Sequence, residues 1–179
     1  DYVSKSKILG VYAMNDEKLS DNEEYKFNQT VSKIIKNFDV VVVSDYGHGL
    51  ISRKTAQVIC KKSKFLALNA QVNASNIGYH SIQKYKKVDC VLINQVELCH
   101  ELRDKNSKTE ILIKRLAKNI KAKDLIVTRG SKGAILYSSK TKKFIYCPAF
   151  ASKVIDKVGA GDTMLSVLSI LLKSKFFNL

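Results

Sequence analysis

Residues 40–60 read VVVVSDYGHGLISRKTAQVIC, and this stretch decides the fold. It opens with four valines, which make both faces of an extended chain apolar, and the run stops at the polar sequence SDYG. Such runs are typical of central strands in a parallel sheet, because helices cover both faces of that sheet. A helix is expected after Ser52. Ala56, Ile59 and Cys60 mark its apolar face.

The same strand–helix unit recurs along the chain. Further apolar runs stop at a polar residue, and segments with helical spacing lie between them. The runs are 65–68, 91–93 and 125–127, and the helical segments are marked by Phe27, Val31, Ile34, Ile35 and Phe38, by Val96, Cys99 and Leu102, and by Ile113, Leu116, Ala117 and Ile120. This repetition predicts an α/β fold, with a doubly wound, mostly parallel sheet and helices on both faces. The strand-end residues expected on one rim of the sheet are Asp45, Asn69, Asn94 and Thr128.

The pattern changes toward the C-terminal end. Residues 134–137 and 144–147 flank the polar stretch 138–142, which predicts a hairpin. The sequence GAGDT at 159–163 then leads into the apolar segment 164–173, which predicts a last helix. The side chains expected to be mostly buried in this helix are Met164, Leu165, Val167, Leu168 and Leu171.

The composition bounds the class of protein. The 179 residues suit one domain, and a hydrophobic fraction of 45% is enough to build a core. No apolar run reaches the roughly 18–20 residues of a membrane span, so no membrane partner is expected. The four cysteines form no C-x-x-C pair, which argues against a zinc site and favours buried free thiols of a cytoplasmic protein.

The net charge is strongly positive, at +15 from 31 Lys+Arg residues against 16 Asp+Glu residues. A basic stripe would suit nucleic acid or an anionic substrate. The lysines are spread along the whole chain, however, and no basic run is interleaved with aromatic residues. A solvated lysine-rich surface is the preferred interpretation, and no nucleic-acid partner is expected.

The sequence Gly159-Ala160-Gly161-Asp162 stands directly before the last predicted helix. Small residues let backbone N–H groups approach a ligand closely, and the start of a helix adds unpaired donors and a partial positive charge. Together these groups form an anion site for a phosphoryl group, beside which the Asp162 carboxylate can accept a proton from a substrate hydroxyl. The residues alone leave a second interpretation open, in which Asp162 only caps the helix.

Asp156-x-x-Gly159-Ala160-Gly161-Asp162 resembles the C-terminal signature of the ribokinase-like (PfkB) carbohydrate kinases. The resemblance implies that Asp162 is the catalytic base. It implies that the backbone of Gly159, Ala160 and Gly161 forms the anion hole. It also implies that Asp156 belongs to a monovalent-cation site.

Two further motifs resemble those of this family and come in the same order. NQVE at 94–97 resembles the N-x-x-E motif that organises magnesium and phosphate, and TRGSKG at 128–133 resembles the T-x-G-x-x-G turn that faces the ATP phosphates. Glu97 is thereby assigned to Mg²⁺, through water or phosphate. Alone, the first motif is typical of a helix cap and the second of a turn between strands. The residues assigned to nucleotide binding by this resemblance are Asn94, Glu97, Thr128, Gly130 and Gly133.

SDYGHG at 44–49 resembles the S-D-Y-x-K-G segment of the heptose-phosphate kinase branch of the family. On this basis Asp45 and Asn69 are assigned to the sugar substrate. His48 stands where that branch often has lysine, and NAQ at 69–71 replaces the common D-P-K. These departures leave the identity of the acceptor open.

The resemblance covers essentially the whole chain and implies that 1–179 is a single ribokinase-like nucleotide-binding domain fragment. It is expected to be incomplete at both ends, lacking the N-terminal half with the sugar site and lid as well as the final helices. The implied activity is transfer of the ATP γ-phosphoryl group to a hydroxyl of a small-molecule sugar or sugar phosphate. The implied cofactors are ATP and Mg²⁺, with K⁺ as a further ion, and a homodimer is expected of the full-length parent.

Two other functions compete with this interpretation. A non-catalytic nucleotide-binding or regulatory module would use the same cleft without the base. A nicotinamide-dependent dehydrogenase requires G-x-G-x-x-G after the first strand. None of the glycine-rich turns, at 47–49, 130–133 and 159–161, fits that pattern.

Overall fold

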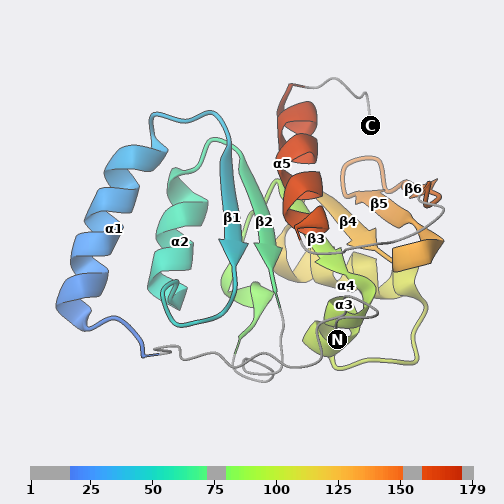
Figure 1. Ribbon diagram of the computed structural model, residues 1–179, viewed down its shortest axis with the longest axis horizontal. Helices are drawn as coiled ribbons and strands as arrows, with labels where there is room; N and C mark the ends of the chain where they lie inside the picture. The colour runs from blue at the N-terminus through green and yellow to red at the C-terminus, as the bar shows by residue number, and fades with distance from the viewer. Residues whose placement is uncertain (1–16, 72–79, 151–158, 175–179) are drawn as a thin grey trace, which may run out of the picture.

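The structure is a computed structural model, and it describes residues 17–71, 80–150 and 159–174. These residues form a six-stranded sheet with helices on both faces (Figure 1). The strands are β1 (Val41–Asp45), β2 (Leu66–Ala70), β3 (Cys90–Asn94), β4 (Asp124–Thr128), β5 (Ala134–Ser138) and β6 (Phe144–Cys147). The helices are α1 (Asp21–Ile35), α2 (Arg53–Lys62), α3 (Gln95–Leu102), α4 (Thr109–Ile120) and α5 (Ala160–Lys173), with short 3₁₀ turns η1 (Ile82–Lys84) and η2 (Gly130–Lys132).

The strands lie in the sheet in their order along the chain. β1 to β4 pair in parallel, whereas β5 and β6 are antiparallel and form the expected hairpin. The registers of 41–45 against 66–70 and of 90–94 against 124–128 align the carboxyl ends of these strands. The predicted α/β class and the shared rim of strand ends are therefore confirmed.

Local signals in the sequence set where the helices begin. The Ser20 side chain accepts a hydrogen bond from the backbone N–H of Glu23, whose carboxylate accepts from the Ser20 N–H in return. Such a capping box satisfies two backbone donors that a helix start leaves unpaired. Ser52 caps α2 by accepting from the N–H of Thr55. The predicted helix after Ser52 is confirmed.

The two faces of the sheet bury cores of unequal size. Alternate strand residues such as Leu66 and Leu68 pack on one face beneath α1 to α4, in a large cluster that includes Leu116. α5 covers the opposite face (Figure 1), and its Leu165 belongs to a smaller cluster there. This smaller cluster comprises Ala67, Cys90, Leu92, Ile126 and Leu165. α5 thus lies over the middle of the sheet and contacts β1, β2 and β3.

Several buried positions expected from the sequence are exposed instead. β1 is an edge strand of the described sheet, so Val42 is 43% exposed rather than covered on both sides. Val167 on α5 is 52% exposed, because that helix packs through Leu165. On α3, Val96 is 64% exposed and Leu98 is buried, because the cap at Asn94 sets the phase of the helix. On α1, Ile35 is buried, while Ile34 and, beyond the helix, Phe38 are exposed.

The four cysteines are free, but their environments differ. Cys90 is buried in β3, and burial raises the pKa of its thiol to about 12. Cys60 and Cys99 are partly buried in helices, and Cys147 is exposed on β6. The expectation of uniformly buried thiols is wrong for Cys147, since β6 is the outer strand of the hairpin.

Asp45 anchors the turn that follows β1. Its buried carboxylate accepts hydrogen bonds from Tyr85 Oη at 2.6 Å and from the N–H of Gly47 at 3.0 Å, and it pairs with Lys84 Nζ at 2.7 Å. Lys84 Nζ also donates to the carbonyl of Ile51. Burial opposes ionisation, but the hydrogen bonds from Lys84 and Tyr85 and the charge of Lys84 outweigh it and hold the pKa of Asp45 below its usual value.

This network predicts a stability that depends on pH. A carboxyl group with a lowered pKa in the folded protein stabilises the fold above its unfolded pKa, and the contribution is lost as pH falls through the folded value. Asp45→Asn is expected to lower the free energy of unfolding at pH 7 by about 3 kcal/mol, because Lys84 loses its buried partner. The difference from wild type should shrink below about pH 4. Urea unfolding at several pH values measures it.

Asp39→Asn is the matched control. Asp39 pairs with Lys64 at 3.1 Å, but its side chain is 77% exposed, and such surface pairs contribute at most about 1 kcal/mol. Equal costs for the two substitutions at pH 7 would contradict the anchoring role of Asp45.

Candidate functional site

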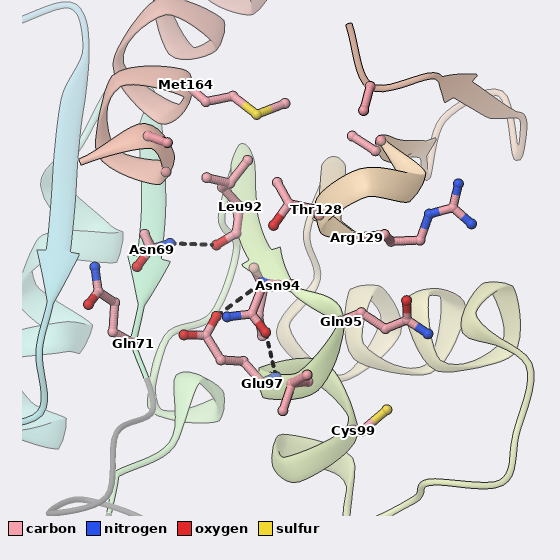
Figure 2. A pocket seen from close by; sticks show the side chains of 18 of the residues that line it. Asn69, Gln71, Leu92, Asn94, Gln95, Glu97, Cys99, Thr128, Arg129 and Met164 are labelled. Atoms are coloured by element: carbon pink, nitrogen blue, oxygen red, sulfur yellow. Dashed lines mark hydrogen bonds between the residues drawn. The ribbon is translucent and has the colours of Figure 1, made fainter. Parts of the chain in front are cut away.

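A cleft of about 1090 Å³ lies at the carboxyl ends of the central strands (Figure 2). Strands β2, β3 and β4, the hairpin and the first turn of α5 all contribute residues to its walls. The sequence-predicted residues that line it are Asn69, Asn94, Glu97, Thr128, Gly130, Gly133, Ala160 and Gly161. The structure therefore brings residues that are up to 92 positions apart in the sequence into one site.

Three other predicted residues do not line the cleft. Gly159 and Asp162 stand on either side of Ala160 and Gly161, which do line it. The Asp45 carboxylate is held by Lys84 and Tyr85. Asp156 lies outside the described residues.

Asn94 and Glu97 begin α3 with a reciprocal pair of hydrogen bonds. Asn94 Oδ1 accepts from the N–H of Glu97 at 2.9 Å, and Glu97 Oε2 accepts from the N–H of Asn94 at 3.0 Å (Figure 2). The Glu97 residue is only 9% exposed, yet it lines the cleft. The cap explains the N-x-x-E spacing physically, and it fixes a carboxylate against the cleft wall.

The turn between β4 and β5 depends on Gly133. Its φ of 77° and ψ of −140° are nearly restricted to glycine. A Cβ atom there would lie 1.9 Å from the carbonyl oxygen of Cys147 on β6. Gly130 also has a positive φ, of 58°, but a Cβ atom there would meet nothing within 4 Å. The fold thus requires glycine at 133, because only a residue without a side chain lets β6 approach the turn.

The first turn of α5 faces the cleft with small residues. Gly159 occupies the N-cap position with a φ of 75°, and it provides no side-chain hydrogen bond to the helix start. Ala160 and Gly161 follow it and line the cleft. A Cβ atom at Gly161 would lie 3.8 Å from Leu92 Cδ2, an ordinary contact. Packing within the protein therefore does not require glycine at 161.

Asp162 is the third residue of α5, three positions after the N-cap Gly159 rather than at the cap itself. Its carboxylate Oδ1 accepts a hydrogen bond from Ser44 Oγ at 2.9 Å. Ser44 lies on β1, where it pairs in register with Asn69 of β2. Asp162 therefore faces the β1 side of α5, while its neighbour Gly161 lines the cleft.

Asn69 presents a buried polar atom at this place. It is 6% exposed, and its side-chain amide donates to the carbonyl of Leu92 at 3.2 Å (Figure 2). Its Oδ1 has no hydrogen-bond partner among the described residues. Buried polar atoms are normally satisfied, so this oxygen is suited to a donor from a ligand.

Sequence reasoning missed three basic residues around the cleft. His100, Lys105 and Arg129 line it, although the positive charge of the chain predicted only a solvated surface. The Arg129 guanidinium also donates to the carbonyl of Lys132, which holds it beside the β4–β5 turn. The available signal was the position of Arg129, directly after the strand-end residue Thr128.

Among residues 17–71, 80–150 and 159–174, no helix is long and apolar enough to cross a membrane. The same residues contain no cluster of three or more His, Cys, Asp and Glu side chains suited to a metal ion.

Comparison with known proteins identifies the family. The model of the pfkB family carbohydrate kinases matches residues 12–174. The chain belongs to this family. The bifunctional protein HldE of Campylobacter curvus is 32% identical over 157 residues, which cover 86% of this chain and 32% of that protein. HldE of Desulfatibacillum aliphaticivorans is 27% identical over 173 residues, covering 94% of this chain and 34% of that protein.

Solved structures of pfkB-type kinases show the same fold. The tetrameric inhibited form of phosphofructokinase-2 from Escherichia coli superposes with a TM-score of 0.70 at 18% identity, over 88% of this chain and 52% of that one. Arabidopsis thaliana ribokinase complexed with ribose and ATP gives a TM-score of 0.59 at 22% identity, over 88% and 48%. The chain thus spans about a third of the HldE relatives and half of these kinases.

The two glycines of the β4–β5 turn, Gly130 and Gly133, are expected to respond differently to replacement by alanine. Gly133→Ala is expected to lower the free energy of unfolding by more than 3 kcal/mol, because its methyl group would overlap the Cys147 carbonyl and its φ and ψ would be strained. Gly130→Ala carries only the cost of a left-handed residue, about 1–2 kcal/mol. Urea unfolding of both variants measures the difference, and similar losses would show that the contact with β6 is unimportant.

Proposed function

We propose that this chain binds ATP in the cleft and takes part in transfer of the γ-phosphoryl group to a hydroxyl of a sugar or sugar phosphate. The observation that carries the proposal is the start of α5. Ala160 and Gly161 line the cleft in the first turn of α5, where a helix leaves its backbone N–H groups without partners inside the helix, and Asp162 follows on the β1 side. A donor phosphate and an acceptor hydroxyl would meet across this turn.

The cleft combines the charged and apolar side chains expected of a site for a nucleoside triphosphate. Lys105 and Arg129 supply positive charge, and apolar side chains such as Val96 and Met164 suit the adenine base. The family resemblance assigns Thr128 and the glycine turn after it to the ATP phosphates, and Thr128, Gly130 and Gly133 all line the cleft.

Mg²⁺ fits the same cleft. Glu97 offers a fixed carboxylate, and Mg²⁺ typically uses one or two protein carboxylates together with substrate phosphates. When bound, the ion would neutralise charge on the phosphates. The K⁺ assigned to Asp156 stays a prediction, because that residue lies outside the described part of the chain.

In the proposed reaction Asp162 accepts the proton of the acceptor hydroxyl. The hydroxyl oxygen then attacks the γ-phosphorus, the bond to the β–γ bridging oxygen breaks, and ADP leaves. The amides of Ala160 and Gly161 would hold the negative charge of the transferring group. Asn69 Oδ1, in the strand beside Ser44, would accept from an acceptor hydroxyl.

The acceptor is proposed to be a phosphorylated sugar. The similar proteins named HldE and the SDYGHG sequence at 44–49 both favour the heptose-phosphate branch of the family. His48 and the Asn69–Gln71 stretch depart from that branch, so specificity is best decided by a panel of sugars and sugar phosphates.

Replacement of the proposed base tests catalysis. In the full-length protein, Asp162→Asn is expected to lower kcat by about 10²–10⁴-fold, the usual contribution of a general base, with the Kd for ATP unchanged. Folding should survive, because Gly159 and not Asp162 is the N-cap. An ATP-coupled assay gives kcat, and calorimetry gives the Kd. Unchanged turnover would favour the alternative, a non-catalytic nucleotide-binding module.

Alanine at 161 tests the anion site. Gly161→Ala should leave the unfolding free energy within about 1 kcal/mol of wild type, because the added methyl group meets only Leu92 at an ordinary distance. It should weaken ATP binding by about 10-fold or more, because the methyl group would crowd a phosphate beside the helix amides. Ala160→Gly is the control, because it changes the same first turn of α5 without adding a methyl group. Wild-type ATP affinity in Gly161→Ala would remove the anion site from the proposal.

A further inference from the structure

Ser44 joins β1 to the proposed catalytic carboxylate. Its hydroxyl lies 2.9 Å from Asp162 Oδ1, across 118 positions of sequence. As a donor to a carboxylate, the Ser44 hydroxyl proton is committed to Asp162. Nothing in the chemistry of nucleotide binding requires this contact, since Ser44 does not line the cleft.

The alternating geometry of a strand puts Ser44 in this place. Successive side chains of a strand point to opposite faces of the sheet. Asp45 therefore points into the large core, where Lys84 and Tyr85 hold it, and Ser44 points to the face that carries α5. The Asp45 network fixes the end of β1, and with it the position from which Ser44 reaches Asp162.

We propose that Ser44 is a positioning residue for Asp162, an inference that rests on the proposed function. The hydrogen bond to Oδ1 restrains rotation of the carboxylate and directs Oδ2 toward the acceptor hydroxyl. The acceptor proton passes to Oδ2, while Ser44 keeps its own proton and forms no covalent bond. In this proposal the acceptor hydroxyl lies between β1 and β2, beside the register pair of Ser44 and Asn69.

The competing interpretation is that the hydrogen bond between Ser44 and Asp162 serves only to hold β1 against α5. Both side chains are accessible to solvent, so the bond would add only modestly to stability. A purely structural bond predicts that loss of the Ser44 hydroxyl alters stability but leaves turnover normal at temperatures where the protein is folded. A positioning residue predicts a loss of kcat that depends on Asp162.

The test compares five variants of the full-length protein with wild type. Ser44→Ala is expected to lower kcat by about 10–100-fold, with little change in the Kd for ATP, because misplacement of a reacting group has costs of this order. Ser44→Thr keeps the hydroxyl on an exposed strand position and should restore most of the activity. Val42→Ala is the matched control, because Val42 lies on the same exposed face of β1 and is outside the site.

The double variant Ser44→Ala/Asp162→Asn isolates the coupling. If Ser44 acts through Asp162, this variant turns over no more slowly than Asp162→Asn alone. An equal further loss in the Asp162→Asn background, or a kcat for Ser44→Ala within twofold of wild type, would overturn the positioning role. These results leave the proposed function intact, whereas wild-type turnover by Asp162→Asn removes both.

A second readout needs no turnover. In the chain labelled with ¹³C at aspartate carboxyls, Ser44→Ala should shift the Asp162 resonance and leave that of Asp45 in place. Ser44→Thr should return the Asp162 resonance toward its wild-type position. An Asp162 resonance that does not respond to Ser44→Ala would show that the hydrogen bond is absent in solution, and the inference would fail.

Discussion

The parallel, in-register pairing of β1 to β4 is the constraint on which the site depends. It brings the strand ends Ser44, Asn69, Asn94 and Thr128 to one edge of the sheet, although the intervening helices separate them widely in sequence. α5 packs over the face of the sheet, and its first turn lines the cleft at the same edge. Ligand sites at the carboxyl ends of parallel strands are a general consequence of this architecture, because loops and helix starts converge there.

Two carboxylates near this edge have opposite roles because of strand alternation. Asp45 is turned into the core, where Lys84 and Tyr85 satisfy it, so its contribution is to stability. Asp162 is reached from the other face by Ser44, next to the cleft and accessible to solvent. The sequence places Ser44 and Asp45 side by side, yet the pleat of the strand assigns one to the proposed chemistry and the other to the fold.

The glycines divide in a similar way. Gly133 is required by the protein itself, since any side chain would collide with β6. Gly161 has room for a methyl group within the protein, so its small size has no structural explanation. Its position in the first turn of α5, facing the cleft, instead suits the close approach of a ligand to the backbone. The two motifs look alike as sequence, but the fold requires glycine at 133 and leaves room for a side chain at 161.

The sequence by itself determined the strand–helix alternation, the hairpin, the strand-end residues and the family, because these depend on local periodicity and on short motifs. Only the tertiary structure decided which apolar faces are covered, since Val42, Val96 and Val167 are exposed despite their apolar character. It alone revealed the contact between Ser44 and Asp162. Local patterns specify the face of an element, but long-range packing selects the partner that meets it, and no periodicity in the chain encodes that choice.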